Sequence, residues 1–312
     1  MDAAIDIGTN TVRMLLGDVC AERIHPARYF RRITRLGGGA GSSGELSEEA
    51  MSRTLNALKE AAQLIGTNDV RRIKVVGTEA LRRAPNRSVF GREVFEQTGL
   101  SLEVIDGEQE ARLSAAGVMA ALDPFPRRCL IFDIGGGSTE FVLCDDSAIV
   151  FHRSYPLGVV ALGEARLDAE PMDIFINTSL DRLCSDLVAA ALPDVATSPD
   201  CVLVGTAGTV TTLAALKLEM VAYDWRRVNN LAISKNELQN LERRLAPLSV
   251  SERETLPGME KGRGDLILPG VRIVLALMER LQKDRLTVSD FGLLEGILLD
   301  LAERPPSQPG CN

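Results

Sequence analysis

The sequence contains little of the cysteine and histidine chemistry on which many metal and thiol proteins depend. Its six cysteines form no CxxC pair, which argues against a zinc ribbon or an iron–sulfur loop. The only two histidines, His25 and His152, are too isolated for a histidine-based metal site. A GxSxG nucleophile elbow is also missing. We interpret the cysteines as reduced core thiols of a cytoplasmic protein.

Long apolar runs and a signal peptide are missing as well. No run approaches the roughly 18 residues that a membrane-spanning helix needs. The first residues, MDAAIDIG, are acidic where a secretory signal peptide is basic. We therefore expect a cytoplasmic protein with no membrane partner, and its 312 residues suffice for about two ordinary domains.

The net charge is −8, which argues against a protein that binds nucleic acid non-specifically. The charge is unevenly distributed along the chain. Residues 13–92 carry 15 basic and 8 acidic side chains, whereas the remaining residues carry 20 basic and 35 acidic ones. This basic stretch predicts local binding of an anionic ligand, or else a surface of solvated arginines.

The most informative feature is an internal repeat. Residues 5–16 (IDIGTNTVRMLL) align without gaps on residues 132–143 (FDIGGGSTEFVL). Each copy reads as an apolar strand, Asp-Ile-Gly, a small polar turn and a second apolar strand. Because a motif repeated about one domain apart is typical of duplicated domains, we expect two related domains that face each other.

Helix and strand patterns alternate after each copy, which predicts a mixed α/β fold. We expect domains at 1–122 and 123–296, joined by a tight crossover near 120–128, and a C-terminal helix at about 297–312 that packs back on the first domain. Predicted helices lie at 45–65, 88–99, 109–121, 174–192, from about 210, and 266–283. Predicted strands lie at 71–76, 102–105, 201–204 and 288–290.

Three segments rich in Gly, Ser and Thr each follow a predicted apolar strand. Backbone N–H groups and hydroxyls at a strand end are the donors that phosphate oxygens need. None of the three is a Walker A loop or a dinucleotide-binding GxGxxG turn. Together they predict a site for a polyphosphorylated ligand in an interdomain cleft, with phosphate bound by Gly8, Thr9, Asn10, Thr11, Gly135, Gly136, Gly137, Ser138, Thr139, Gly205, Thr206, Gly208 and Thr209.

Carboxylates stand directly beside these turns. Asp6 and Asp133 end the strands that lead into the first two turns, and Glu140 begins the strand after the second. A carboxylate repels phosphate unless a divalent cation bridges the two, so we expect Mg²⁺, or Mn²⁺ in its place, with Asp6, Asp133 and Glu140 as ligands. The alternative is that the aspartates only cap their own turns.

Two further glutamates, Glu108 and Glu110, begin the helix that follows the turn Asp106-Gly107. The helix dipole stabilises acids at this end of a helix, which is sufficient to explain Glu108. Glu110 lies at the start of the helix that leads to the domain crossover. From there it could face the cleft and act as a general base on a water molecule.

Seven segments between residue 3 and about residue 296 form a recognisable set: AAIDIGTNTVRMLLGDV, TEALRRAPN, VIDGEQEARLSAAGV, IFDIGGGSTEFVL, SYPLGVVALGE, VGTAGTVTTLAAL and LILPGVRIVLALME. The set resembles the Ppx/GppA family of exopolyphosphatases and guanosine pentaphosphate phosphohydrolases. The resemblance implies the α/β fold of the actin-like ATPase superfamily, with two ribonuclease H-like domains flanking an interdomain cleft.

The resemblance also implies roles for individual residues. Glu110, the second glutamate of the GxxEA motif, corresponds to the catalytic base, and Asp133 and Glu140 lie near the metal and the attacking water. Asp6 completes the catalytic set. Arg82, the arginine of the TxALRxAxN segment, and Arg13 would neutralise charge on the phosphoryl group. The implied reaction releases orthophosphate from the end of polyphosphate, or the 5′ γ-phosphate from pppGpp in the stringent response, and the implied assembly is a homodimer.

Three segments depart from the family pattern. The usual Arg-Leu-Thr-Glu is Ala161-Leu162-Gly163-Glu164, Arg-Ala-Asp is Arg263-Gly264-Asp265, and Gly-Leu-Arg-Glu-Gly has Leu294 in place of the arginine. The missing arginines at Ala161 and Leu294 leave the choice between polyphosphate and pppGpp open. Two alternative functions stay open: a phosphotransferase (kinase) of the same superfamily, and a (p)ppGpp-binding regulator with low turnover.

Overall fold

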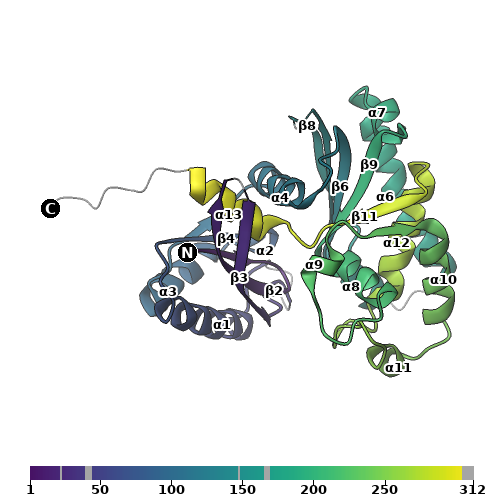
Figure 1. The fold of residues 1–312 in the computed structure, drawn as a ribbon. Coiled ribbons are helices and arrows are strands. Elements are labelled where there is room, and N and C mark those ends of the chain that lie inside the picture. Colours follow the sequence, from purple (N-terminus) through teal and green to yellow (C-terminus); the bar gives the residue numbers. More distant parts are fainter. Residues whose placement is uncertain (22, 39–43, 147, 165–168, 304–312) are drawn as a thin grey trace. The chain divides into compact units, whose positions relative to one another are not determined.

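The computed structural model describes residues 1–21, 23–38, 44–146, 148–164 and 169–303. They form two compact units, Met1–Ala120 with the described part of Gly292–Asn312, and Ala121–Phe291 (Figure 1). The second unit ends at Phe291 and not at 296, because helix α13 (Leu293–Glu303) begins directly after Gly292 and packs on the sheet of the first unit. The expected helix beyond residue 303 lies outside the described residues.

The first unit is built on a five-stranded sheet in the order β3-β2-β1-β4-β5. The first three strands form an antiparallel meander, whereas β4 and β5 run parallel to β1. The strands are β1 (Asp2–Ile7), β2 (Thr11–Cys20), β3 (Arg23–Ile33), β4 (Arg72–Gly77) and β5 (Leu102–Val104). Besides α13, the helices are α1 (Glu48–Gly66), α2 (Glu79–Arg83), α3 (Arg87–Thr98) and α4 (Gly107–Ala121).

The second unit is built on a six-stranded sheet in the order β10-β11-β9-β6-β7-β8. Its strands are β6 (Arg128–Ile134), β7 (Thr139–Asp145), β8 (Ala148–Tyr155), β9 (Cys201–Thr206), β10 (Ala232–Ser234) and β11 (Arg285–Val288). Its helices are α5 (Val159–Glu164), α6 (Ala169–Ala189), α7 (Pro193–Thr197), α8 (Ala207–Lys217), α9 (Trp225–Val228), α10 (Lys235–Leu245), α11 (Val250–Glu254) and α12 (Ile267–Arg280).

The two sheets share one plan, which extends the repeat seen in the sequence. In both, a three-stranded antiparallel meander is followed by parallel strands beside its first strand, and β10 is an addition to the second sheet. Even a register shift recurs at equivalent positions, between Leu16 and Gly17 in β2 and between Leu143 and Cys144 in β7. Each unit therefore has the ribonuclease H-like sheet that the sequence predicts.

Several element boundaries differ from the predicted ones. Helix α1 begins at Glu48 and not at residue 45, because the Ser47 hydroxyl accepts a hydrogen bond from the amide of Ala50 at 3.3 Å and caps it. Strands β3 and β8 are edge strands that the sequence pattern did not predict, since the register shift interrupts their alternation. Helices α10 and α11 were also not expected, although a serine–glutamate capping box begins each of them.

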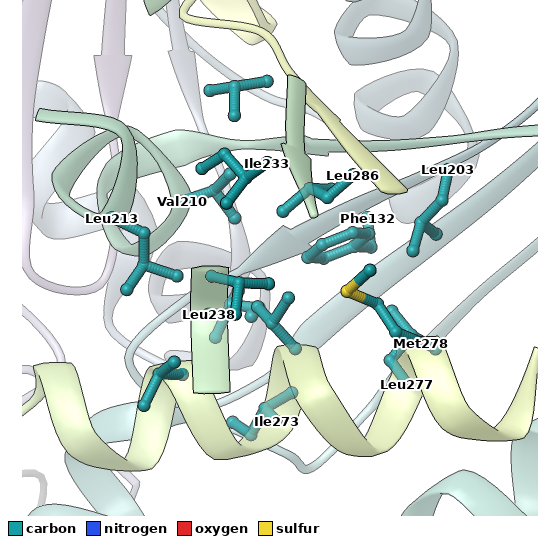
Figure 2. Packing of buried hydrophobic residues seen from close by; sticks show 14 of the residues in the cluster. Phe132, Leu203, Val210, Leu213, Ile233, Leu238, Ile273, Leu277, Met278 and Leu286 are labelled. Atoms are coloured by element: carbon teal, nitrogen blue, oxygen red, sulfur yellow. The ribbon is translucent and has the colours of Figure 1, made fainter. Parts of the chain in front are cut away.

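Each unit has its own hydrophobic core. In the second unit, Phe132 and Leu203 from the central strands lie above Ile273, Leu277 and Met278 of α12 (Figure 2). In the first unit, the core lies between one sheet face and helices α1 and α3, while α13 packs on β1 and β2. Within the described residues, no helix is both long and apolar enough to cross a membrane.

Candidate functional site

The first Gly/Thr loop is the turn between β1 and β2. The amide of Gly8 donates to the carbonyl of Thr11 at 2.9 Å and closes the turn. Asp6, on the strand before it, is buried and lies opposite Arg13 in the antiparallel register. The guanidinium of Arg13 donates to Oδ2 of Asp6 from Nε at 3.0 Å and from Nη2 at 2.6 Å. The charge of Asp6 is therefore compensated within the first unit.

The second loop repeats this turn between β6 and β7. The amide of Gly135 donates to the carbonyl of Ser138, also at 2.9 Å. At the position equivalent to Arg13 stands Glu140, which lies opposite Asp133 in the register. Facing side chains of an antiparallel pair have Cβ atoms about 4.5–5.5 Å apart. The second unit therefore places two carboxylates side by side where the first has an ion pair.

Two serine hydroxyls contact Glu140. Oε1 of Glu140 accepts hydrogen bonds from the hydroxyls of Ser138 at 2.6 Å and Ser154 at 2.8 Å. Thr206 of β9 lies beside Asp133 in the parallel register, and Ser154 of β8 lies beside Glu140. Thr206, Asp133, Glu140 and Ser154 thus form one row across four neighbouring strands.

The third Gly/Thr segment is not the turn that we expected. Helix α8 begins at Ala207, three residues before the predicted start, so that Gly208 and Thr209 lie in its first turn. Ala207 has a φ of +62°, which turns the chain sharply from strand to helix. The hydroxyl of Thr209 donates to the carbonyl of Ile134 at 3.3 Å, which ties this turn to the strand that carries Asp133.

Arg263 lies against this helix start. A Cβ atom added to Gly208 would be 2.1 Å from Nη2 of Arg263, so a larger residue there would displace the guanidinium. Nε of Arg263 donates to Glu260 at 2.5 Å. The guanidinium at the amino end of α8 is therefore paired with a carboxylate, and the N–H groups of the helix start are the donors that an anion could use.

Glu110 lies near the amino end of α4 in the first unit. Nη1 of Arg82, from α2, donates to Oε2 of Glu110 at 2.5 Å and also to the carbonyl of Ile105 at 3.2 Å. Both side chains are partly exposed. The predicted base and the predicted phosphate-binding arginine therefore form an ion pair.

The structure thus gathers the predicted residues into local groups within each unit. The first unit joins Asp6 with Arg13 and Glu110 with Arg82. The second unit brings Asp133, Glu140, Ser138 and Thr206 onto neighbouring strands. Three of the predicted phosphate-binding threonines are buried, and their hydroxyls donate to protein carbonyls: Thr139 to Leu157, Thr206 to Phe291 and Thr209 to Ile134. Among the described residues, an added Cβ on Gly137 would meet no atom within 4 Å.

The side chains present fit a magnesium ion better than a transition metal. Among the described residues, no group of three or more His, Cys, Asp or Glu side chains could hold a metal. Mg²⁺ is usually held by one or two carboxylates, with waters and substrate phosphates as its other ligands. Asp133 and Glu140 supply two neighbouring carboxylates. Oδ1 of Asp6 is buried with no hydrogen-bond partner in the described part of the chain, so it could also accept a cation.

Two residues of these groups were not singled out from the sequence. Ser154 lies on a strand that the pattern did not predict, and only the pairing of β7 with β8 brings it to Glu140. Arg263 is far from Gly208 in the sequence. Only its position in the segment Arg263-Gly264-Asp265, which resembles the family's Arg-Ala-Asp, could have pointed to it.

If the chain hydrolyses phosphate anhydrides with Mg²⁺, as the sequence predicts, Ser154→Ala should lower phosphate release about twofold to tenfold, the effect of losing one hydrogen bond to Glu140. The Mg²⁺ concentration that gives half-maximal rate should then rise, because Glu140 would be less well held. Ser185→Ala is the matched control, since in the described part of the chain its hydroxyl bonds to the carbonyl of Asp181 within α6 and to no group of the site. An unchanged Mg²⁺ dependence in the Ser154 variant would show that Ser154 does not position Glu140.

The paired sheets and their strand-end loops define a protein of the actin-like ATPase superfamily with two ribonuclease H-like domains. The model of the Ppx/GppA phosphatase family matches residues 19–305, and the chain belongs to this family. It is therefore a phosphohydrolase of the exopolyphosphatase family. The family and the fold class predicted from the sequence are both confirmed.

Individual relatives agree with this membership over almost the whole chain. Exopolyphosphatase 2 of Mycobacterium tuberculosis (strain CDC 1551) is 35% identical over 313 residues, which cover 96% of this chain and 98% of that protein. The solved structure of the Aquifex aeolicus Ppx/GppA family member is 32% identical, with a TM-score of 0.82 and 96% of each chain covered. An exopolyphosphatase structure from Cytophaga hutchinsonii is 26% identical, with a TM-score of 0.84 and the same coverage.

Proposed function

We propose that the protein is a Mg²⁺-dependent phosphohydrolase that releases orthophosphate from the end of inorganic polyphosphate, from the 5′ γ-position of pppGpp, or from both. The observation that carries the proposal is the pairing of Asp133 with Glu140 beside a Gly/Ser turn. Two neighbouring carboxylates cost free energy unless a cation or a proton lies between them. A phosphate-bound cation meets that need and also compensates the substrate's charge.

In the proposed reaction, Glu110 removes a proton from the water that attacks the terminal phosphorus. The hydrogen bond from Arg82 at 2.5 Å orients the carboxylate of Glu110. The amides and hydroxyls of the two turns, together with Arg82 and Arg263, bind the phosphate oxygens and stabilise the charge of the transition state. Phosphoryl transfer needs mainly this positioning and charge stabilisation, because little of its chemistry is covalent.

Asp133 and Glu140 would hold the magnesium ion, with Asp6 as a further candidate, and Mn²⁺ could replace it. When bound, the ion would neutralise charge on the phosphate groups. Both predicted phosphate-binding arginines are paired with a carboxylate, Arg13 with Asp6 and Arg82 with Glu110. In this scheme each guanidinium orients its carboxylate, and any contact with phosphate shares that guanidinium.

Polyphosphate is the favoured substrate, because relatives in Mycobacterium tuberculosis and Cytophaga hutchinsonii are named exopolyphosphatases. The arginine that many family members carry at position 294 is here a leucine, buried at the start of α13. Position 161 lies in α5 and is an alanine. A chain without these two arginines has fewer groups to contact a guanine nucleotide or further phosphates.

The decisive experiment measures phosphate release side by side on short polyphosphate, long polyphosphate and pppGpp. We expect release from polyphosphate that requires Mg²⁺, stops with excess EDTA and returns when Mg²⁺ is restored. Full activity in EDTA would exclude the metal requirement. Faster release from pppGpp than from either polyphosphate would reverse the substrate preference.

The same experiment separates the other two functions. Adding ADP should not divert phosphate into ATP, and ATP formed in excess of free phosphate would indicate the kinase. Tight binding of ppGpp in a calorimeter without any phosphate release would indicate a regulator with low turnover. The homodimer stays a prediction, which sedimentation of the purified chain would test.

A further inference from the structure

The carbonyl groups of the first Gly/Thr loop are held by the segment that follows β3. The amides of Thr34 and Arg35 both donate to the carbonyl of Asn10, at 2.9 and 3.0 Å. The amide of Gly37 donates to the carbonyl of Thr9 at 2.9 Å. The two carbonyls at the tip of the loop are therefore bound from one side.

The second loop is held in the same way by the segment that follows β8. The amide of Val159 donates to the carbonyl of Gly135 at 3.1 Å, and that of Val160 to the carbonyl of Gly136 at 2.9 Å. In the repeat, Gly136 is the equivalent of Thr9. Both units therefore use the connection after the third strand of the meander to hold the loop between the first two strands.

This arrangement determines where the loop amides point. In a planar trans peptide, the C=O of one residue and the N–H of the next point in opposite directions. Since the carbonyls of Thr9, Gly135 and Gly136 point toward the holding segments, the amides of Asn10, Gly136 and Gly137 point away from them. Within the described residues, no protein oxygen accepts a hydrogen bond from these three amides. They are left available for a ligand's oxygens.

Each holding segment carries a glycine at its close contact with the loop, facing a side-chain methyl in the first unit and backbone atoms in the second. A Cβ atom on Gly37 would be 2.5 Å from Cγ2 of Thr9, and one on Gly158 would be 2.2 Å from the carbonyl oxygen of Gly136. In the first unit the chain also turns at Arg35, whose φ of +48° lies in the left-handed region. A non-glycine residue in that region costs free energy, which the bonds to Thr9 and Asn10 offset.

We propose that Gly37 and Gly158 are positioning residues for phosphate binding. Each lets its segment hold the loop carbonyls, and so directs the loop amides toward the phosphate oxygens. Neither glycine touches the substrate in this scheme. The inference rests on the proposed function, because it concerns the same two loops, but it makes a separate prediction about affinity.

The test compares Gly37→Ala and Gly158→Ala with the wild-type protein in steady-state hydrolysis of tripolyphosphate. We expect KM to rise about tenfold or more, as for the loss of hydrogen bonds to a charged group, and kcat to fall less than KM rises. Gly66→Ala is the control, because a Cβ atom at Gly66, at the end of α1, meets nothing within 4 Å. Circular dichroism verifies that each variant is folded.

A second substitution makes the test independent of folding defects. Thr9→Ser removes the methyl group that an alanine at position 37 would meet and keeps the hydroxyl, so the Gly37→Ala/Thr9→Ser double variant should regain the KM of Thr9→Ser alone. Adding Thr9→Ser to Gly158→Ala should leave the raised KM unchanged. An alanine at position 158 would meet the backbone oxygen of Gly136 in the second unit, which Thr9→Ser does not alter. An unchanged KM in Gly37→Ala, or no recovery in the double variant, would overturn the inference.

A second measurement distinguishes failure of the proposed hydrolase activity from failure of the positioning role of Gly37 and Gly158. If the wild-type protein released no phosphate from any substrate, calorimetry with tripolyphosphate would still compare the affinities of the wild-type protein and the variants. Weaker binding by Gly37→Ala that Thr9→Ser restores would then support the positioning role without hydrolysis. Equal affinities, or no binding by the wild-type protein, would refute it.

Discussion

Replacing Glu110 with alanine should lower phosphate release by about two to four orders of magnitude, the usual contribution of a general base. Affinity for polyphosphate should change little, because the loop amides and arginines bind the phosphates in this scheme. Steady-state rates and calorimetric binding of the same preparation measure the two effects. A variant that keeps a near wild-type rate would show that another group activates the water.

The neighbouring Glu108 provides a matched control for this substitution. It lies on the same first turn of α4 and is exposed, so Glu108→Ala removes the same charge from the same helix end. We expect its rate to stay within about twofold of wild type, because exposed substitutions away from a site usually have small effects. If both variants lost activity equally, the charge at the helix end would matter and a base at Glu110 would not be needed.

The second large effect concerns the contact between α4 and α13 in the first unit. A Cβ atom on Gly117 would be 1.9 Å from the carbonyl oxygen of Gly292, and one on Gly296 would be 1.8 Å from that of Leu113. Both obstacles are backbone atoms, which cannot rotate away. Gly117→Ala should therefore lower the free energy of unfolding by about 1–3 kcal/mol or more, as overpacking does in protein cores.

A glycine-to-alanine substitution at Gly91 should instead raise the free energy of unfolding. Gly91 lies within α3, where the nearest atom to an added Cβ is 4.0 Å away. Alanine loses less conformational freedom than glycine when a helix forms, so Gly91→Ala should stabilise the protein by about 0.5–1 kcal/mol. Thermal midpoints of the two variants provide the comparison. A destabilised Gly91→Ala, or an unaffected Gly117→Ala, would contradict these contacts.

The repeated strand–turn–strand unit could be predicted because its signals are local. Asp6-Ile7-Gly8 and Asp133-Ile134-Gly135 each combine an apolar strand with a turn that glycine and small polar residues favour, and both appear as hairpins closed by equivalent bonds. The third strand of each meander could not be predicted in this way. Its residues alternate irregularly because of the register shift beside Gly17 and Cys144.

The third Gly/Thr segment shows the limit of reading a turn from composition. Gly205 to Thr209 looks like the other two segments, yet the chain passes directly from β9 into α8 at Ala207. A Cβ at Gly205 would be 2.7 Å from the ring of the buried Phe132, and one at Gly208 would displace the guanidinium of Arg263. Both contacts involve residues far away in the sequence, so no local pattern contains them.

By itself, the sequence determined the family, the ribonuclease H-like fold class and the duplicated loops, because these depend on residue types at short spacing. The tertiary structure alone decided how the charges are partnered: Arg13 neutralises Asp6, whereas at the equivalent position Glu140 stands beside Asp133 and is held by Ser154. It also decided which loop amides are free to bind, through Gly37 and Gly158. The physical reason is that these partners lie on separate strands and connections, which only the folded sheet brings within hydrogen-bonding distance.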